Sequence, residues 1–145
     1  MPRGRDDRPA FESGLRAGVA IAGLLLAAAP VVYRFARSWS LRGTVAGDSM
    51  APLLRHGDWI LVDPDAYRRR SVGRGDLVVI PDPREPSRIL VKRVAAVDRD
   101  GLLNLVGDNP ACSTDSRQFG PLKPEQVLGR PWARYWPPRR AGLLR

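Results

Sequence analysis

The chain has 145 residues, a formal net charge of +9, and 14 residues each of proline and glycine. This length allows one modest domain with an added anchor or tail, and the composition favours short elements joined by turns. A lone cysteine, Cys112, excludes an internal disulfide framework. Because the chain also has a single histidine, it lacks the ligands of a structural zinc site, and we expect neither a metal nor a cofactor. The charge favours an anionic partner such as lipid headgroups or nucleic acid.

The N-terminal segment divides into a polar tail and an apolar run. Residues 1–16 are polar and rich in arginine, which predicts disorder. Residues 17–33 carry no charge, and about 17–25 apolar residues can span a bilayer, so we predict a transmembrane anchor over residues 17–35. A buried core helix is one alternative, but the run has no polar face. A cleaved secretory signal is another, but Pro30 would then follow the A-x-A-like cleavage site. Arginines flank both ends, so the flanking charges do not define the orientation.

Residues 40–138 are predicted to form a mainly β domain. Turn signals such as GD, DRDG and GDNP separate short apolar runs along this segment. Short strands at regular spacing with turns between them are typical of an all-β domain. The expected strands cover residues 41–46, 59–62, 77–80, 88–97, 102–106 and 127–135. Two prolines end the domain, and residues 139–145 are predicted to be a loose basic tail.

Two short motifs carry groups suited to the hydrolysis of a peptide bond. The turn GDSMAP at residues 47–52 would present the hydroxyl of Ser49, although the same residue types also make ordinary turns. Only Lys92 and Lys123 among the 24 basic residues are lysines, and Lys92 shares a strand face with Leu90 and Val94. An apolar environment lowers the pKa of a lysine. A neutral Lys92 would be able to accept the proton of Ser49, as the base of a Ser–Lys pair.

Four sequence blocks, in the same order, resemble those of the type I signal peptidases. They are GDSMAP at residues 47–52, RGDLVV at 74–79, VKRV at 91–94 and GDNPACSTDSRQFG at 107–120. Together they cover residues 44–129. The resemblance implies a signal-peptidase/LexA-like β fold of short strands, preceded by one N-terminal transmembrane helix, and a serine endopeptidase that uses a Ser–Lys dyad.

The resemblance also implies a role for each matched residue. Ser49 attacks the scissile carbonyl, Lys92 activates it, and the backbone N–H of Ser49 stabilises the oxyanion. Gly47 stands where some members carry an additional hydroxyl, so no side-chain donor is expected. The supporting residues are Ser113, which orients the lysine amine, the ion-paired residues Asp115 and Arg117, and Arg93 as a further partner of Asp115.

Other polar residues near these blocks are interpreted as structural. Some relatives use a histidine base, but that base occupies the position held here by Lys92, so we interpret His56 as a surface turn residue. Asp108 and Asn109 are interpreted as turn-formers. Pro110 follows Asn109 where many relatives have arginine, a change that affects a loop rather than the dyad.

These features predict a single-pass enzyme of the cell membrane, with its catalytic domain on the extracytoplasmic side. It would be a monomer that removes N-terminal signal or leader peptides from precursor proteins, with membrane lipid and no nucleic acid as a partner. A dedicated protease for the leader of a nickel-type superoxide dismutase is the alternative, because the compact domain and its last block resemble that group as well. A self-cleaving LexA-type regulator would need a DNA-binding domain before the β domain, and a polar tail followed by an apolar helix does not supply one. A non-catalytic basic module would not explain Lys92.

Overall fold

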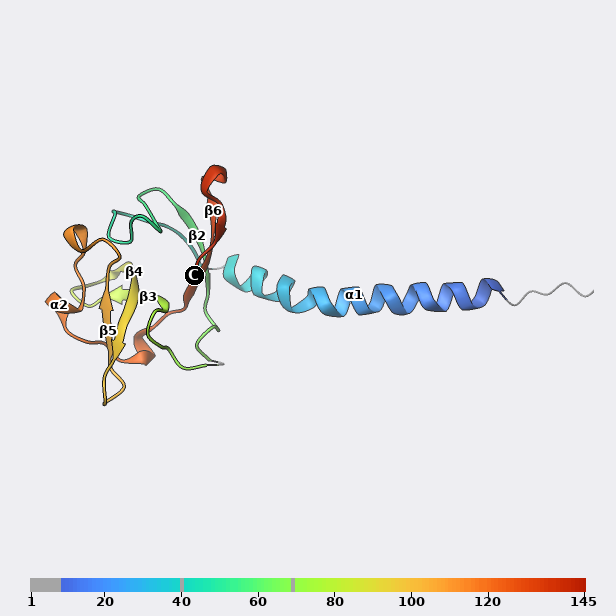
Figure 1. The fold of residues 1–145 in the computed structure, drawn as a ribbon, viewed down its shortest axis with the longest axis horizontal. Helices are drawn as coiled ribbons and strands as arrows, with labels where there is room; N and C mark the ends of the chain where they lie inside the picture. The colour runs from blue at the N-terminus through green and yellow to red at the C-terminus, as the bar shows by residue number, and fades with distance from the viewer. Residues whose placement is uncertain (1–8, 40, 69) are drawn as a thin grey trace, which may run out of the picture. The chain divides into compact units, whose positions relative to one another are not determined.

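The computed structural model describes residues 9–39, 41–68 and 70–145 and divides into two compact units, Met1–Ala36 and Arg37–Arg145. Helix α1, Pro9–Trp39, accounts for the described part of the first unit (Figure 1). It therefore includes residues 9–16 of the predicted disordered tail, whereas residues 1–8 lie outside the described residues. The predicted transmembrane anchor, residues 17–35, lies within α1 and is not supported: in the described parts of the chain, no helix is long and apolar enough to cross a membrane.

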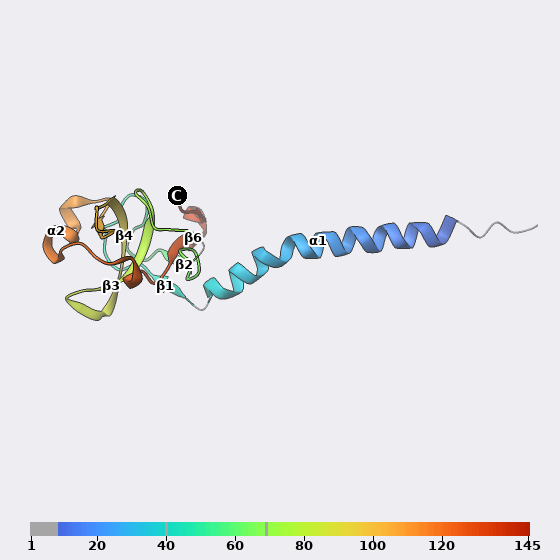
Figure 2. The same ribbon diagram turned by 90° about the horizontal axis from the view of Figure 1, so that it is seen from below.

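The second unit contains two antiparallel sheets, which confirms the mainly β class (Figures 1 and 2). The order of the four-stranded sheet is β1-β2-β6-β7 and that of the three-stranded sheet is β3-β4-β5. A β-bridge between Val79 and Gly129 joins the two sheets. The strands are β1 (Arg42–Thr44), β2 (Trp59–Asp63), β3 (Leu77–Asp82), β4 (Glu85–Val97), β5 (Leu103–Val106), β6 (Arg130–Trp136) and β7 (Gly142–Leu143). The short helices are η1 (Pro110–Cys112), α2 (Ser116–Phe119), η2 (Pro124–Gln126) and η3 (Pro138–Arg140).

Strand β3 lies between two hydrophobic cores. Leu77 and Val79 pack into a first core with Met50, Leu54, Ile60, Val62 and Leu144. Val78 and Ile80 point to the other side and pack into a second core with Val94, Leu103, Leu105 and Leu122. Burial on both faces explains why this strand is an unbroken apolar run rather than an alternation of apolar and polar residues. The same packing holds β4, the partner of β3, between the two cores.

Residues 139–145 are not the loose tail that the sequence predicts. They complete η3 and form β7, which pairs with β6. Leu144 is only 4% exposed in the first core, and its amide donates to the carbonyl of Trp132 at 2.9 Å. The prediction is wrong because two residues of strand are too short to give a periodic signal. The side chain of the next residue, Leu144, nevertheless packs in a core built by distant segments.

Candidate active site

The loop between β1 and β2 carries Ser49 in a conformation that depends on glycine. Gly47 has φ +85°, a backbone region that glycine adopts without steric strain. Its N–H donates to Nδ1 of His56 at 3.2 Å, and the N–H of His56 donates to Asp48 at 3.1 Å. The backbone therefore explains why this position has no side-chain hydroxyl. It also gives His56, predicted as a surface turn residue, a part in shaping the loop.

Two distant segments hold the other side of this loop. The amide of Asn109 donates to the carbonyl of Ser49 at 2.9 Å, and its side chain donates to the carbonyl of Asp48 at 3.2 Å. Arg140 of η3 donates to the carbonyl of Pro52 at 3.2 Å and to the buried Asp58 at 2.9 Å. These bonds leave the N–H of Ser49 without a hydrogen-bond partner among the described residues. That donor is available to a developing oxyanion.

Strand β4 buries Lys92, which is only 1% exposed and lies opposite Val78 of β3. Burial lowers the pKa of Lys92 below its ordinary value, because apolar surroundings stabilise an ammonium group less well than water does. The carboxylate of Asp115 acts in the opposite direction. Desolvation is the larger effect, so the neutral amine is favoured relative to an exposed lysine.

A chain of hydrogen bonds fixes the amine of Lys92. Its Nζ donates to Oγ of Ser113 at 3.0 Å, and that hydroxyl donates to Oδ2 of Asp115 at 2.9 Å. Asp115 is fully buried and receives two bonds of 2.8 Å from the guanidinium of Arg117. The hydrogen bond from Arg117 is the main reason that the pKa of Asp115 lies well below its usual range. The hydroxyl of Ser113 uses its proton in the hydrogen bond to the carboxylate of Asp115. Its oxygen can therefore only accept a hydrogen bond from Lys92.

Asp115 also begins helix α2. Its carboxylate accepts from the amide of Arg117 at 3.2 Å, and its own amide donates to Gln118 at 2.8 Å, which completes a capping box. The short helix therefore holds the acceptor that orients Ser113.

The sequence predicts that Arg93 pairs with Asp115, but in the structure Arg93 pairs with Asp108 instead. Its Nε and Nη2 donate to the two carboxylate oxygens of Asp108 at 2.7 and 2.8 Å. Neighbouring side chains of a strand point to opposite faces, so Arg93 is directed away from the face on which Lys92 meets Ser113. Asp108 is thus an ion-pair partner as well as a turn residue, and it ties β4 to the segment that holds Asn109.

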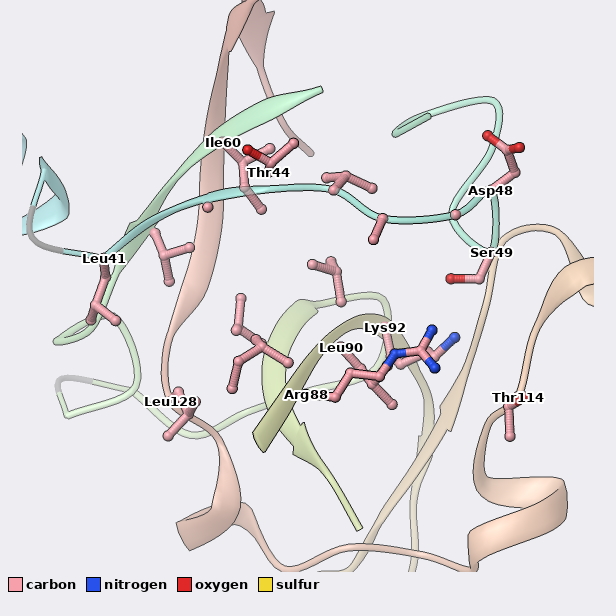
Figure 3. Close-up of a pocket in the computed structure, with 18 of the residues that line it drawn as sticks. Leu41, Thr44, Asp48, Ser49, Ile60, Arg88, Leu90, Lys92, Thr114 and Leu128 are labelled. Atoms are coloured by element: carbon pink, nitrogen blue, oxygen red, sulfur yellow. The ribbon is translucent and has the colours of Figure 1, made fainter. Parts of the chain in front are cut away.

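The side chains of Ser49 and Lys92 both line a cleft of about 470 Å³ (Figure 3). Ser49 enters from the loop and Lys92 from β4, while apolar residues such as Val45, Ile60 and Leu90 form much of the wall. No hydrogen bond joins Ser49 to Lys92 within the described ranges. The cleft brings together a hydroxyl, a buried amine and a free backbone donor, which are the parts needed for acyl transfer.

Gly107 is a site residue, although its sequence context predicts only a turn. A Cβ at this position would lie 2.5 Å from the carbonyl oxygen of Ser49 and 2.6 Å from Cβ of Ser113, and it would also overlap Oγ of Ser113. Glycine is needed here because two chain segments approach closely, not because φ is positive. No signal in one sequence distinguishes these two reasons for a glycine.

We expect Gly107→Ala to lower kcat/KM for a leader substrate by about 100-fold, because a displacement of about 1 Å in a catalytic site can have such an effect. Gly142→Ala is the control, since Gly142 in β7 has no positive φ and open space around it. Both variants are compared by circular dichroism and by cleavage rate. Equal activity of Gly107→Ala and wild type would show that the site tolerates the displacement.

Comparison with known proteins shows the family of this chain. The profile of the family described as signal peptidase, peptidase S26, matches residues 16–102. The chain is 34% identical over 123 residues to the mitochondrial ATP-independent inner membrane protease subunit 1a of Arabidopsis thaliana, covering 70% of this chain and 73% of that protein. It is 32% identical over 119 residues to the mitochondrial inner membrane protease subunit 1 of Xenopus tropicalis, covering 69% and 71%. It is 29% identical over 134 residues to subunit 2 of Mus musculus, covering 78% and 77%. The chain is therefore a serine peptidase that belongs to the signal peptidase family, peptidase S26.

Proposed function

We propose that this peptidase removes N-terminal leader peptides from precursor proteins, with Ser49 as the nucleophile and Lys92 as the general base. The observation that carries the proposal is the buried Lys92 amine, held by Ser113 in the cleft that Ser49 also lines. The names of its relatives describe subunits of inner membrane proteases, so we place the substrates of this enzyme at a membrane. The predicted monomer stays a prediction.

The hydrogen-bond chain defines how the proton would move. A neutral amine has one lone pair, and because Lys92 donates a hydrogen to Ser113, the lone pair is left for the hydroxyl of Ser49. As Oγ of Ser49 bonds to the scissile carbonyl carbon, the proton of the Ser49 hydroxyl passes to Nζ of Lys92. The carbonyl oxygen becomes an oxyanion that accepts from the N–H of Ser49.

The second half of the reaction uses the same groups. The ammonium of Lys92 returns its proton to the leaving nitrogen when the peptide C–N bond breaks, which leaves the leader as an ester on Ser49. Water then attacks this ester, again giving a proton to Lys92, and the ester bond breaks to release the leader and restore the Ser49 hydroxyl. The reaction needs no other proton acceptor.

Cleavage should depend on pH through Lys92. Protonated Lys92 cannot accept a proton, so kcat/KM rises with pH as the amine becomes neutral. Because burial lowers the pKa of Lys92 from 10.5, the midpoint of this rise should lie below the value of an ordinary lysine. Rates measured from about pH 6 to about pH 10 locate the midpoint. A profile without a rise in this range, in a protein that stays folded, would exclude this role of the lysine.

Cleavage of intact precursors tests the function itself. The purified full chain is incubated with a precursor that carries a secretory leader and, separately, with a nickel-type superoxide dismutase that carries its own leader. Mass spectrometry of the products should show one cut at the junction between leader and mature protein. A cut only in the dismutase would favour the dedicated maturation protease. Cleavage of neither precursor, or scattered cleavage, would contradict leader processing.

A further inference from the structure

One cation in the cleft acts on Lys92 only through its charge, which adds to the effect of burial in lowering the pKa of Lys92. Arg88 of β4 lines the cleft together with Ser49 and Lys92, and Figure 3 shows its guanidinium directed toward Lys92. Residues 88, 90 and 92 share one face of the strand, and all three line the cleft. Among the residues that the structure describes, Arg88 has no hydrogen bond or ion pair.

The neighbouring Arg84 shows why Arg88 is distinctive. Arg84 also lines the cleft, but its Nε and Nη2 donate to the buried carboxylate of Asp82 at 3.1 and 2.8 Å. Its charge is therefore already compensated within the protein. Arg88 forms no such ion pair and interacts with Asp82 only through the longer-range attraction between their charges, although the two arginines lie on the same hairpin.

Arg88 is exposed in the free protein, so its guanidinium is accessible to a bound peptide. Apolar side chains form much of the cleft wall, and a bound peptide would exclude further water, so the attraction between opposite charges would be stronger than in open solvent. A guanidinium can donate two parallel hydrogen bonds to one carboxylate. A second positive group beside Lys92 also disfavours basic substrate residues at this point.

We propose that Arg88 is a specificity-determining residue, which selects precursors with an aspartate or glutamate close to the scissile bond. This inference rests on the proposed function, because it names the substrate class of the same cleft. It assigns Arg88 to substrate binding rather than to proton transfer. Its loss should therefore change the choice between substrates without abolishing cleavage of neutral ones.

Peptide binding tests the inference separately from cleavage. Fluorescent peptides spanning the leader junction carry glutamate or glutamine at each position around the scissile bond, and their binding to the full-length Ser49→Ala protein is measured by anisotropy. We expect glutamate to bind about fivefold more tightly at one or more positions, the upper range for a partly exposed ion pair. Arg88→Gln should remove this preference, and Arg88→Glu should reverse it in favour of glutamine. High salt should weaken it.

Arg99→Gln is the matched control, because Arg99 is exposed in the turn after β4 and does not line the cleft. It removes the same charge from the protein and should leave the preference intact. Equal binding of the two peptides at every position, or a preference that survives in Arg88→Gln, would overturn the inference. Absence of cleavage by the wild type would instead contradict the proposed function, because the binding preference is measured without catalysis.

Discussion

Ser49→Ala should lower kcat/KM for a leader substrate by about 10⁴-fold or more, because the hydroxyl of Ser49 is the group proposed to form the acyl ester. The fold should be unaffected, since the hydrogen bonds that hold the loop use the backbone of Ser49 rather than its hydroxyl. Peptide binding should also persist. The measurement is the rate of appearance of the mature N-terminus, followed by mass spectrometry.

Ser71→Ala is the control for this variant, because Ser71 is exposed and does not line the cleft. It should cleave at the wild-type rate. If Ser49→Ala retained wild-type activity, another nucleophile would have to act, and the proposed mechanism would be wrong.

Lys92→Arg should reduce kcat/KM by about 10³-fold or more, although it keeps the positive charge. Arginine stays protonated in proteins, so it cannot accept the proton of Ser49. Lys92→Met serves as a second variant of similar length without a charge, in case the larger guanidinium disturbs the buried site. Both should be inactive across the pH range in which the wild type gains activity.

The other lysine of the chain provides the control for Lys92. Lys123 is exposed at the start of η2, and Lys123→Arg should behave as the wild type. Adding Lys92→Arg to Ser49→Ala should cause little further loss, because groups that act as one unit are not additive. An active and correctly folded Lys92→Arg variant would exclude lysine as the base.

Local patterns in the sequence were sufficient to predict most strands and the environment of Lys92. The alternation around this residue indicates an apolar face, and the structure shows Lys92 buried with Leu90 packed against the same core as Val94. The strand-like runs are recognisable because each is several residues long and bounded by turn residues. Strand β7 is missed because it has only two residues.

The partners of charged residues could not be predicted in the same way. Arg93 pairs with Asp108 rather than Asp115. Arg93 points to one face of β4 and Lys92 to the other, where Asp115 lies, and composition does not reveal which carboxylate meets which face. The requirement for Gly107 likewise arises where its segment meets the carbonyl of Ser49 and the side chain of Ser113. These contacts join segments that are far apart in the chain.

The sequence by itself therefore determined the β class, the candidate nucleophile and the candidate base, since alternation, turn chemistry and motif order are local properties of a chain. The tertiary structure decided what surrounds them. It placed Ser113 and Asp115 beside the amine of Lys92 and tied η3 to the loop of Ser49 through Arg140. Among the described residues, it left Arg88 in the cleft without a hydrogen bond or ion pair. Such arrangements depend on how two sheets pack across a shared core, and side-chain periodicity within one strand carries no information about that packing.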